Sequence, residues 1–166
     1  MPAKEYKQQI LTAVTDLLRD AGFRKKGTLF TRDCGDVTHL ITVQSSVGGT
    51  AEAVRMTVNL GVWVTALAPD EKPDIWSAHW QVRLGFLMPE KRDLWWEAAS
   101  DDEAGAVAER IAGAIREFGL PALSRLADRR ALLDLWKTGV TPGLTAGSAE
   151  PLTEQLTSIV EGPATR

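Results

Sequence analysis

Cysteine is almost absent from the 166-residue sequence, in which Cys34 is the single example. One cysteine excludes an intrachain disulfide and favours a reducing compartment, so we expect a cytoplasmic protein. Histidine is also scarce, since the chain has only His39 and His79. These residues are too few for a metal site built from the usual His and Cys ligands. The sequence therefore predicts neither a disulfide scaffold nor a bound metal.

Long apolar runs and an excess of positive charge are missing as well. No stretch approaches the ~18 uncharged apolar residues of a membrane span. The charged N-terminus is followed by helix-period residues and not by the apolar run of a signal peptide. The 22 acidic residues outnumber the 19 basic ones, giving a net charge of −3, whereas nucleic-acid binders usually carry a basic excess. We expect no membrane association and no nucleic-acid partner.

Sequence motifs for catalysis or cofactor binding are missing too. The glycine-rich stretch Val47-Gly48-Gly49-Thr50 lacks the spaced Gly, Lys and Ser/Thr of a phosphate loop and does not open a helix. There is no Gly-x-Ser-x-Gly, and Cys34 has no neighbouring motif that would mark a nucleophile. We expect no cofactor. The absence of these motifs favours a protein that is not an enzyme.

The first half of the chain changes its hydrophobic period from that of a helix to that of a strand. Five apolar residues at helical spacing predict a helix over residues 3–21, which Gly22 would end. From residue 28 the period becomes two, most clearly over residues 54–64, where apolar and polar residues alternate. The helix residues are Tyr6, Ile10, Val14, Leu17 and Leu18, and the predicted strands are 28–32, 37–45, 54–64 and 79–87, with a longer loop over 65–78.

The second half returns to helical spacing. Ser100 and Glu103 form a capping box, in which each side chain can bond to the other's backbone. That helix is predicted to continue through Phe118 and to end at Gly119. The sequence further predicts a second helix from Pro121 to Gly139, a linker over 139–149 and a short helix over 150–160.

Consecutive strands joined by modest loops favour an antiparallel sheet, and its one apolar face needs helices to cover it. We therefore predict an α+β fold. It has a four-stranded, mainly antiparallel sheet with an N-terminal helix and two or three C-terminal helices on one face. Residues 1–138 would form a single domain, and residues 139–166 a linker and a short C-terminal helix or tail.

The polar face of this sheet is the candidate binding site. Arg and Trp carry much of the energy of typical interfaces, and both occur here beside amide side chains. A plain solvated sheet face is the alternative interpretation. Trp95 and Trp96, just before the capped helix, would form either an aromatic rim to this site or a lid on the core. The candidate residues are Gln44, Arg55, Asn59, Trp63, His79, Gln81 and Arg83.

A series of short motifs runs along the chain between residues 22 and 96: Gly22-Phe23-Arg24-Lys25-Lys26-Gly27 with Phe30, Val43-Gln44-Ser45-Ser46, Val58-Asn59-Leu60-Gly61-Val62, Arg83-Leu84-Gly85 and Trp95-Trp96. In this order and spacing, the motifs resemble the bacterial family known as domain of unknown function 4304. The resemblance covers roughly residues 5–130 and leaves out the segment after Gly139. It implies a small stand-alone bacterial protein, and it implies no activity, cofactor or catalytic residue.

These observations favour a binding module that holds a protein partner or a small polar ligand on the polar sheet face. Arg55 and Arg83 would pair with carboxylates, because guanidinium groups form forked hydrogen bonds with them. The amides of Gln44, Asn59 and Gln81 would fix the orientation. An immunity- or antitoxin-like inhibitor is one form of this role. Two alternatives stay open: an enzyme using His79 with Arg83 on the same face, and a homodimer joined through sheet faces or edges.

Overall fold

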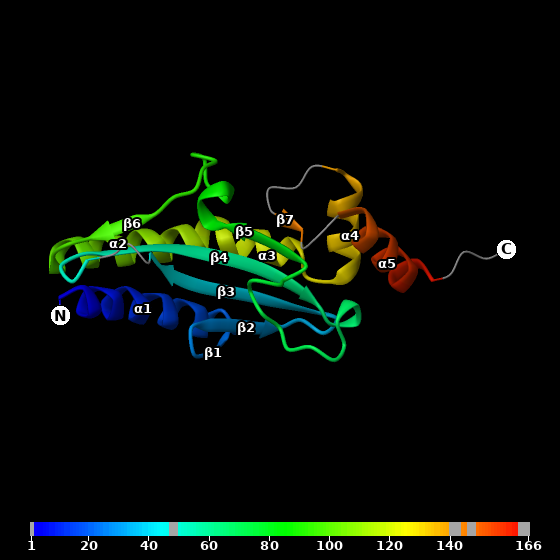
Figure 1. Cartoon of the computed structure of the whole chain (residues 1–166), viewed down its shortest axis with the longest axis horizontal. Helices are drawn as coiled ribbons and strands as arrows, with labels where there is room; N and C mark the ends of the chain where they lie inside the picture. The colour runs from blue at the N-terminus through cyan, green and yellow to red at the C-terminus, as the bar shows by residue number, and fades with distance from the viewer. Residues whose placement is uncertain (1, 47–49, 140–143, 146–148, 163–166) are drawn as a thin grey trace.

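The computed structural model describes residues 2–46, 50–139, 144–145 and 149–162. The glycine-rich connector at 47–49 and most of the predicted 139–149 linker lie outside these residues. A long antiparallel sheet runs along the molecule, with α1 along its lower edge, α2 and α3 behind it, and α5 at the C-terminal end (Figure 1). Within the described ranges, none of the helices combines the length and hydropathy that crossing a bilayer requires.

The N-terminal helix α1 spans Pro2–Asp20 and confirms the helix predicted from periodicity. Ile10, Val14 and Leu18 are its fully buried residues, and they pack into the main core. The helix ends where predicted, because Gly22 adopts a φ of +89°, a left-handed conformation that glycine reaches without steric cost. The backbone N–H of Phe23 then donates to the Leu18 carbonyl oxygen at 2.9 Å.

The sheet is larger than the four strands that the sequence predicts. Its order is β1-β2-β3-β4-β5-β7, β6 pairs with β4 beside this path, and every pairing is antiparallel. The extra strands are two or three residues long, which is too short for an alternating pattern to show. The strands are β1 Arg24–Lys26, β2 Leu29–Asp33, β3 Val37–Ser45, β4 Val54–Val64, β5 Trp80–Arg83, β6 Trp96–Ala98 and β7 Leu144–Thr145.

The two faces of the sheet follow from the alternation in β4. The inner face carries the apolar residues from Val54 to Val64 at even positions, and the helices cover it to form the main core. The outer face carries Arg55, Thr57, Asn59, Gly61 and Trp63. Residues paired across antiparallel strands share a face, so the register brings Thr42, Asn59 and Arg83 into one row on the outer face.

The fourth predicted strand is correct for half of its length. β5 ends at Arg83, and residues Leu84–Leu87 form a 3-10 turn, η2. Gly85 explains the change, because a Cβ on this residue would overlap the Arg92 carbonyl oxygen and lie 2.8 Å from the Leu94 nitrogen. Residues 92–94 therefore cross the backbone of Gly85. The sequence pattern of a strand continues through Leu84, Gly85 and Phe86. The close approach of residues 92–94 prevents a strand from forming there.

The capping box is confirmed at the start of α2, Asp101–Ala114. The Ser100 hydroxyl accepts from the Glu103 N–H at 3.2 Å, and the Glu103 carboxylate accepts from the Ala99 N–H at 2.6 Å. The predicted stop at Gly119 is wrong, because a π-helical turn, η3 (Ile115–Gly119), leads directly into α3 (Leu120–Arg125). Pro121 has no N–H to donate to the preceding turn, and the wider π-turn accommodates this loss.

The second C-terminal helix of the prediction is divided in two. After α3, a new helix, α4, spans Arg129–Lys137, and its N-cap Asp128 accepts from the Ala131 N–H at 2.8 Å. Gly139 follows with a φ of +69°, as expected of the residue that ends a helix.

The last helix, α5, spans Ala149–Glu161 and packs against α4. Its Leu156 is fully buried within the main core. The Glu161 carboxylate accepts hydrogen bonds from Lys137 at 2.8 Å and from Arg130 at 3.2 Å. The predicted boundary at residue 138 therefore separates segments that share one core.

Candidate functional site

One end of the outer face is buried, contrary to the predicted recognition surface. Strand register places Trp63 on this face as predicted, but Trp63 is 1% exposed and His79 is 6% exposed. Residues 65–78, correctly predicted to be largely irregular, fold back over the sheet and bring Ile75 and Ala78 against Trp63 in a second apolar cluster. Neither Trp63 nor His79 is therefore open to a partner.

Gly61 is the sequence signal for this covering segment. A Cβ at this position would lie 3.0 Å from both the Ala78 and Ile75 side chains. A glycine within a strand often marks a place where another part of the chain approaches closely. Gly61 therefore marks the part of the outer face that the segment 65–78 covers, which was expected from the sequence to be exposed.

His79 supports the fold at this end of the sheet. Its Nδ1 accepts a hydrogen bond from the Val64 backbone N–H at 2.9 Å, and its ring centroid lies 4.8 Å from that of Trp63. Burial lowers the pKa of His79, because the charged ring is poorly solvated there. The enzyme alternative, which needs an accessible His79 acting with Arg83, gains no support from this arrangement.

His39 lies on the inner face and is 1% exposed. Its Nδ1 accepts from an Arg32 N–H at 3.0 Å, so its Nε2 carries the proton and donates to the Leu126 carbonyl oxygen at 2.8 Å. Cys34 Sγ lies 3.5 Å from the same Nδ1. Burial lowers the pKa of His39, and the Arg32 charge adds to this effect while the bond to Leu126 opposes it. We assign His39 a structural role.

Because His39 and His79 are buried, we expect the free energy of unfolding to fall in mild acid. Their folded-state pKa values are lowered, so the unfolded chain binds more protons once the pH falls below about 6.5. The free energy of unfolding should therefore decrease from about pH 7.5 to about pH 5.5, by at most about 1.4 kcal/mol per pH unit for each histidine. Urea unfolding at these pH values measures the change. NMR titration showing either folded-state pKa above about 6.5 would contradict the prediction.

The other end of the outer face carries a connected row of polar side chains. Asn59 donates from its amide to the Gln44 Oε1 at 3.0 Å, and its own Oδ1 accepts from the Arg83 Nε at 3.4 Å. Arg83 also donates to the Asp93 carboxylate at 2.5 Å. Asn59 is nearly buried, whereas the Arg83 side chain is 31% exposed. The row therefore holds Arg83 in a fixed orientation at the surface.

Trp95 lies beside two arginines. The guanidinium carbons of Arg55 and Arg83 are each 5.1 Å from the Trp95 ring, a distance at which a cation is attracted to the ring electrons. Arg55 also forms an ion pair with Glu97 at 3.2 Å. We call this group the arginine–tryptophan site, and it comprises Gln44, Arg55, Asn59, Arg83, Asp93, Trp95 and Glu97.

Part of this site was predicted from the sequence. Gln44, Arg55, Asn59 and Arg83 were expected on one face, and the strand register agrees. Trp95 was expected only as a rim or a lid, and Asp93 was given no role. Gln81 lies apart from the site, where its amide donates to the Trp76 carbonyl oxygen at 3.1 Å and helps to hold the covering segment.

The arginine–tryptophan site can bind further acceptors. An arginine has five N–H donors, and within the described part of the chain Arg83 uses one for Asn59 and one for Asp93. The Arg55 side chain is 49% exposed. No group of three or more His, Cys, Asp or Glu suited to a metal ion occurs among the described residues. Arg55 and Arg83 can therefore form hydrogen bonds and ion pairs with an anionic group.

The comparisons with known proteins give a family and no described activity. Residues 14–125 match the family described as Domain of unknown function (DUF4304), a range that contains the whole arginine–tryptophan site and excludes α4, β7 and α5. Neither the curated proteins nor the solved structures yielded a match. Since the family model covers more than half of the sequence, the chain belongs to the DUF4304 family.

Proposed function

We propose that the chain is a binding module that recognises an acidic protein partner through the arginine–tryptophan site. The observation that carries this proposal is the placement of Arg55 and Arg83, each 5.1 Å from one tryptophan ring. Stacked arginines that are already oriented lose little side-chain freedom on binding. Arginine and tryptophan are also enriched among the residues that dominate interface energies.

The surroundings of Arg83 indicate what kind of group it binds. In the free protein Arg83 pairs with Asp93, whose side chain is 41% exposed, so the geometry for a carboxylate is already present. A partner carboxylate can use the remaining Arg83 donors or take the place of Asp93. A small polar ligand is the competing occupant. The site spreads over β3, β4, β5, β6 and the segment before β6, which favours a protein surface.

We further propose that the module works in the cytoplasm of a bacterium, and that an immunity- or antitoxin-like inhibitor is one form of its role. The lone Cys34 supports a reducing compartment. A homodimer joined through the β1 edge is disfavoured, because Arg24, Lys25 and Lys26 are all exposed there and two such edges would repel each other.

Capture from a native cell extract tests the proposal. The wild-type chain and Arg83→Ala are immobilised in equal amounts, and retained proteins are identified by mass spectrometry. We expect an acidic protein that the wild type retains and the variant loses at least tenfold, because the partner's carboxylate loses its charged donor. Arg110→Ala is the matched control, since Arg110 is an exposed arginine on α2.

Stability measurements separate binding from folding in this assay. Arg83→Ala leaves the nearly buried Asn59 Oδ1 without its donor, so we expect a cost of about 1–2 kcal/mol, above the value for an unconnected surface residue. A variant that remains folded and still retains the same protein contradicts the proposal. Loss of that protein with Arg110→Ala as well would also contradict it.

A further inference from the structure

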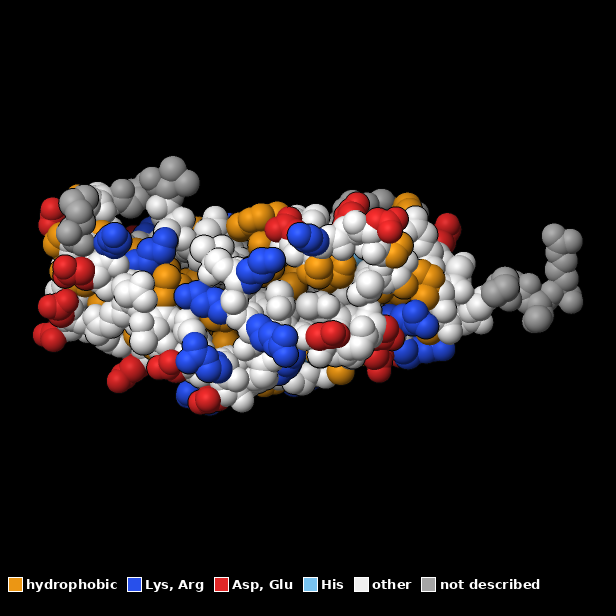
Figure 2. All heavy atoms as spheres, turned by 90° about the horizontal axis from the view of Figure 1, so that it is seen from below, with side chains coloured by type: hydrophobic (Ala, Val, Ile, Leu, Met, Phe, Trp, Pro, Cys, Tyr) orange, Lys and Arg blue, Asp and Glu red, His pale blue; other side chains and the backbone are white. Residues whose placement is uncertain are grey.

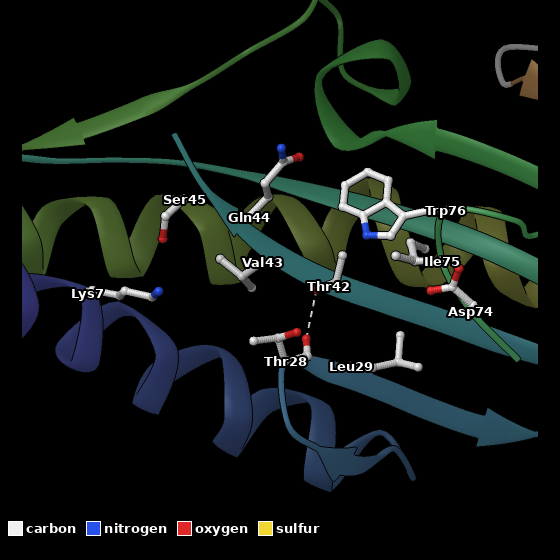
Figure 3. Close-up of a pocket in the computed structure, with 10 residues that line it drawn as sticks. All are labelled: Lys7, Thr28, Leu29, Thr42, Val43, Gln44, Ser45, Asp74, Ile75 and Trp76. Carbon is white, nitrogen blue, oxygen red and sulfur yellow. Dashed lines mark hydrogen bonds between the residues drawn. The ribbon is translucent and has the colours of Figure 1, made fainter. Parts of the chain in front are cut away.

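A hollow of about 330 Å³ lies where β2 begins beside β3, at the side facing α1 (Figure 3). Strand pairing between β2 and β3 stops at Leu29 and Thr42, whereas β3 continues to Ser45. The hollow therefore wraps around a length of β3 that β2 does not cover. It is lined by Lys7, Thr28, Leu29, Thr42, Val43, Gln44, Ser45, Asp74, Ile75 and Trp76.

The backbone of Ser45 faces this open side. The Ser46 N–H donates to the Arg55 carbonyl oxygen on β4, and successive residues of a strand point their backbone groups to opposite sides. The N–H and C=O of Ser45 therefore point away from β4, on the side of β2 but before its first residue, Leu29. Within the described ranges, neither group has a hydrogen-bond partner. An extended peptide segment alongside β3 would satisfy both groups, as a short continuation of β2.

Two side chains beside this backbone offer donors to an anion. The Ser45 hydroxyl oxygen is buried and lacks a hydrogen-bond partner among the described residues. Such a group is costly to leave unpaired in a folded protein, so its presence beside a hollow indicates a missing partner. In Figure 3 the side chains of Ser45 and Lys7 both point into the space between β3 and α1. A hydroxyl, an ammonium and a backbone N–H together suit a carboxylate.

The charge of the surroundings also favours an acidic occupant. Lys26 on β1 pairs directly with Leu29, a residue that lines the hollow, and all three residues of β1 are exposed and basic. Seen from below, Lys and Arg side chains gather across the middle of the face, where β1 and β2 lie, while acidic side chains cluster at the end of the molecule where both α1 and α2 begin (Figure 2). Asp74, at the far side of the hollow, is hydrogen-bonded to Ser77.

We infer that this hollow binds an extended, acidic peptide segment of a partner protein, through the Ser45 backbone, the Ser45 hydroxyl and Lys7. The inference rests on the proposed function and specifies how the partner binds. Gln44 connects the two regions, because it lines the hollow and also accepts the Asn59 hydrogen bond of the arginine–tryptophan site. One partner can therefore cover the outer face and place a strand-like segment at the β3 edge.

Random linear octapeptides displayed on phage are the probe for this segment. They are selected on the full wild-type chain and then measured against variants as free, amidated peptides. We expect selected peptides to carry Asp or Glu and to lose affinity at least tenfold with Ser45→Pro, which removes the outward N–H and no hydrogen bond to β4. Lys7→Ala should weaken binding roughly three- to tenfold by removing the cation. Lys4→Ala, an exposed lysine one turn away, is the matched control and should change binding less than twofold.

Ser45→Ala keeps the experiment decisive if the proline variant fails to fold. It removes a hydroxyl that has no partner among the described residues, so the free protein should be at least as stable, while peptide affinity falls a few fold. Selection of no peptide overturns the inference, as does affinity that Ser45→Ala and Lys7→Ala leave unchanged. If free glutamate binds as tightly as the selected peptides, the peptide backbone has no role in binding and the inference is overturned. Peptides lost only with Arg83→Ala overturn this inference and uphold the proposed function.

Discussion

Replacing Gly85 with alanine is expected to lower the free energy of unfolding by about 3 kcal/mol. The new Cβ would overlap the Arg92 carbonyl oxygen and lie 2.8 Å from the Leu94 nitrogen, so a backbone segment and not a flexible side chain must move. Trp95 follows directly on this segment and would move with it. The same substitution should therefore also disrupt the contacts of Trp95 with Arg55 and Arg83. Urea unfolding and capture of the retained partner measure the two effects.

Gly113→Ala is the matched control for this substitution. Gly113 lies in α2, and a Cβ there would meet nothing within 4 Å. Alanine is a better helix former than glycine, so this variant should be more stable by roughly 0.5–1 kcal/mol. Similar small effects of the two substitutions would show that residues 92–94 do not cross Gly85 as closely as the structure indicates.

Leu156→Ala is expected to cost roughly 3 kcal/mol, the usual range for a fully buried leucine being about 2–5 kcal/mol. Leu156 is fully buried in the main core, although it comes from α5, in the segment predicted to be a linker and a short C-terminal helix or tail outside the domain. Removing its side chain leaves a cavity where α5 packs on the rest of the domain. The measurement is the free energy of unfolding in urea.

Gln155→Ala is the matched control for this cavity, because Gln155 is the exposed neighbour of Leu156 on the same helix. Its effect should stay within about 0.5 kcal/mol. A cost below about 1 kcal/mol for Leu156→Ala would mean that α5 adds little to the core.

The parts of the fold that the sequence predicts well are those with long periodic patterns. Strands β3 and β4 have the predicted bounds, because nine and eleven residues in a row give the alternation room to show. The three-residue strands β1 and β6 carry no such pattern, and their pairing depends on contacts with β2 and β4 that are made only in the folded chain. The run from Gly119 to Pro121 resembles a helix break, but the packed chain continues through a π-turn.

The candidate site was predicted in part for the same reason. Strand phase correctly places Arg55, Asn59 and Arg83 on one face, because alternation fixes which side each residue occupies. It cannot show what covers that face, and so Trp63 and His79 were expected to be accessible, although both are buried and Ile75 and Ala78 of the covering segment pack against Trp63. The partnership of Arg83 with Asp93 joins residues ten positions apart across an irregular segment, for which the sequence has no local pattern.

The central claim is that Arg83 binds a carboxylate of the partner at the arginine–tryptophan site. Titration calorimetry of the captured partner against wild type, Arg83→Ala and Asp93→Asn tests it most directly. The account predicts effects of opposite sign: Arg83→Ala weakens binding at least tenfold, and Asp93→Asn strengthens it about three- to tenfold by removing a competing negative charge. Weaker binding by Asp93→Asn, or unchanged binding by Arg83→Ala, would contradict the claim.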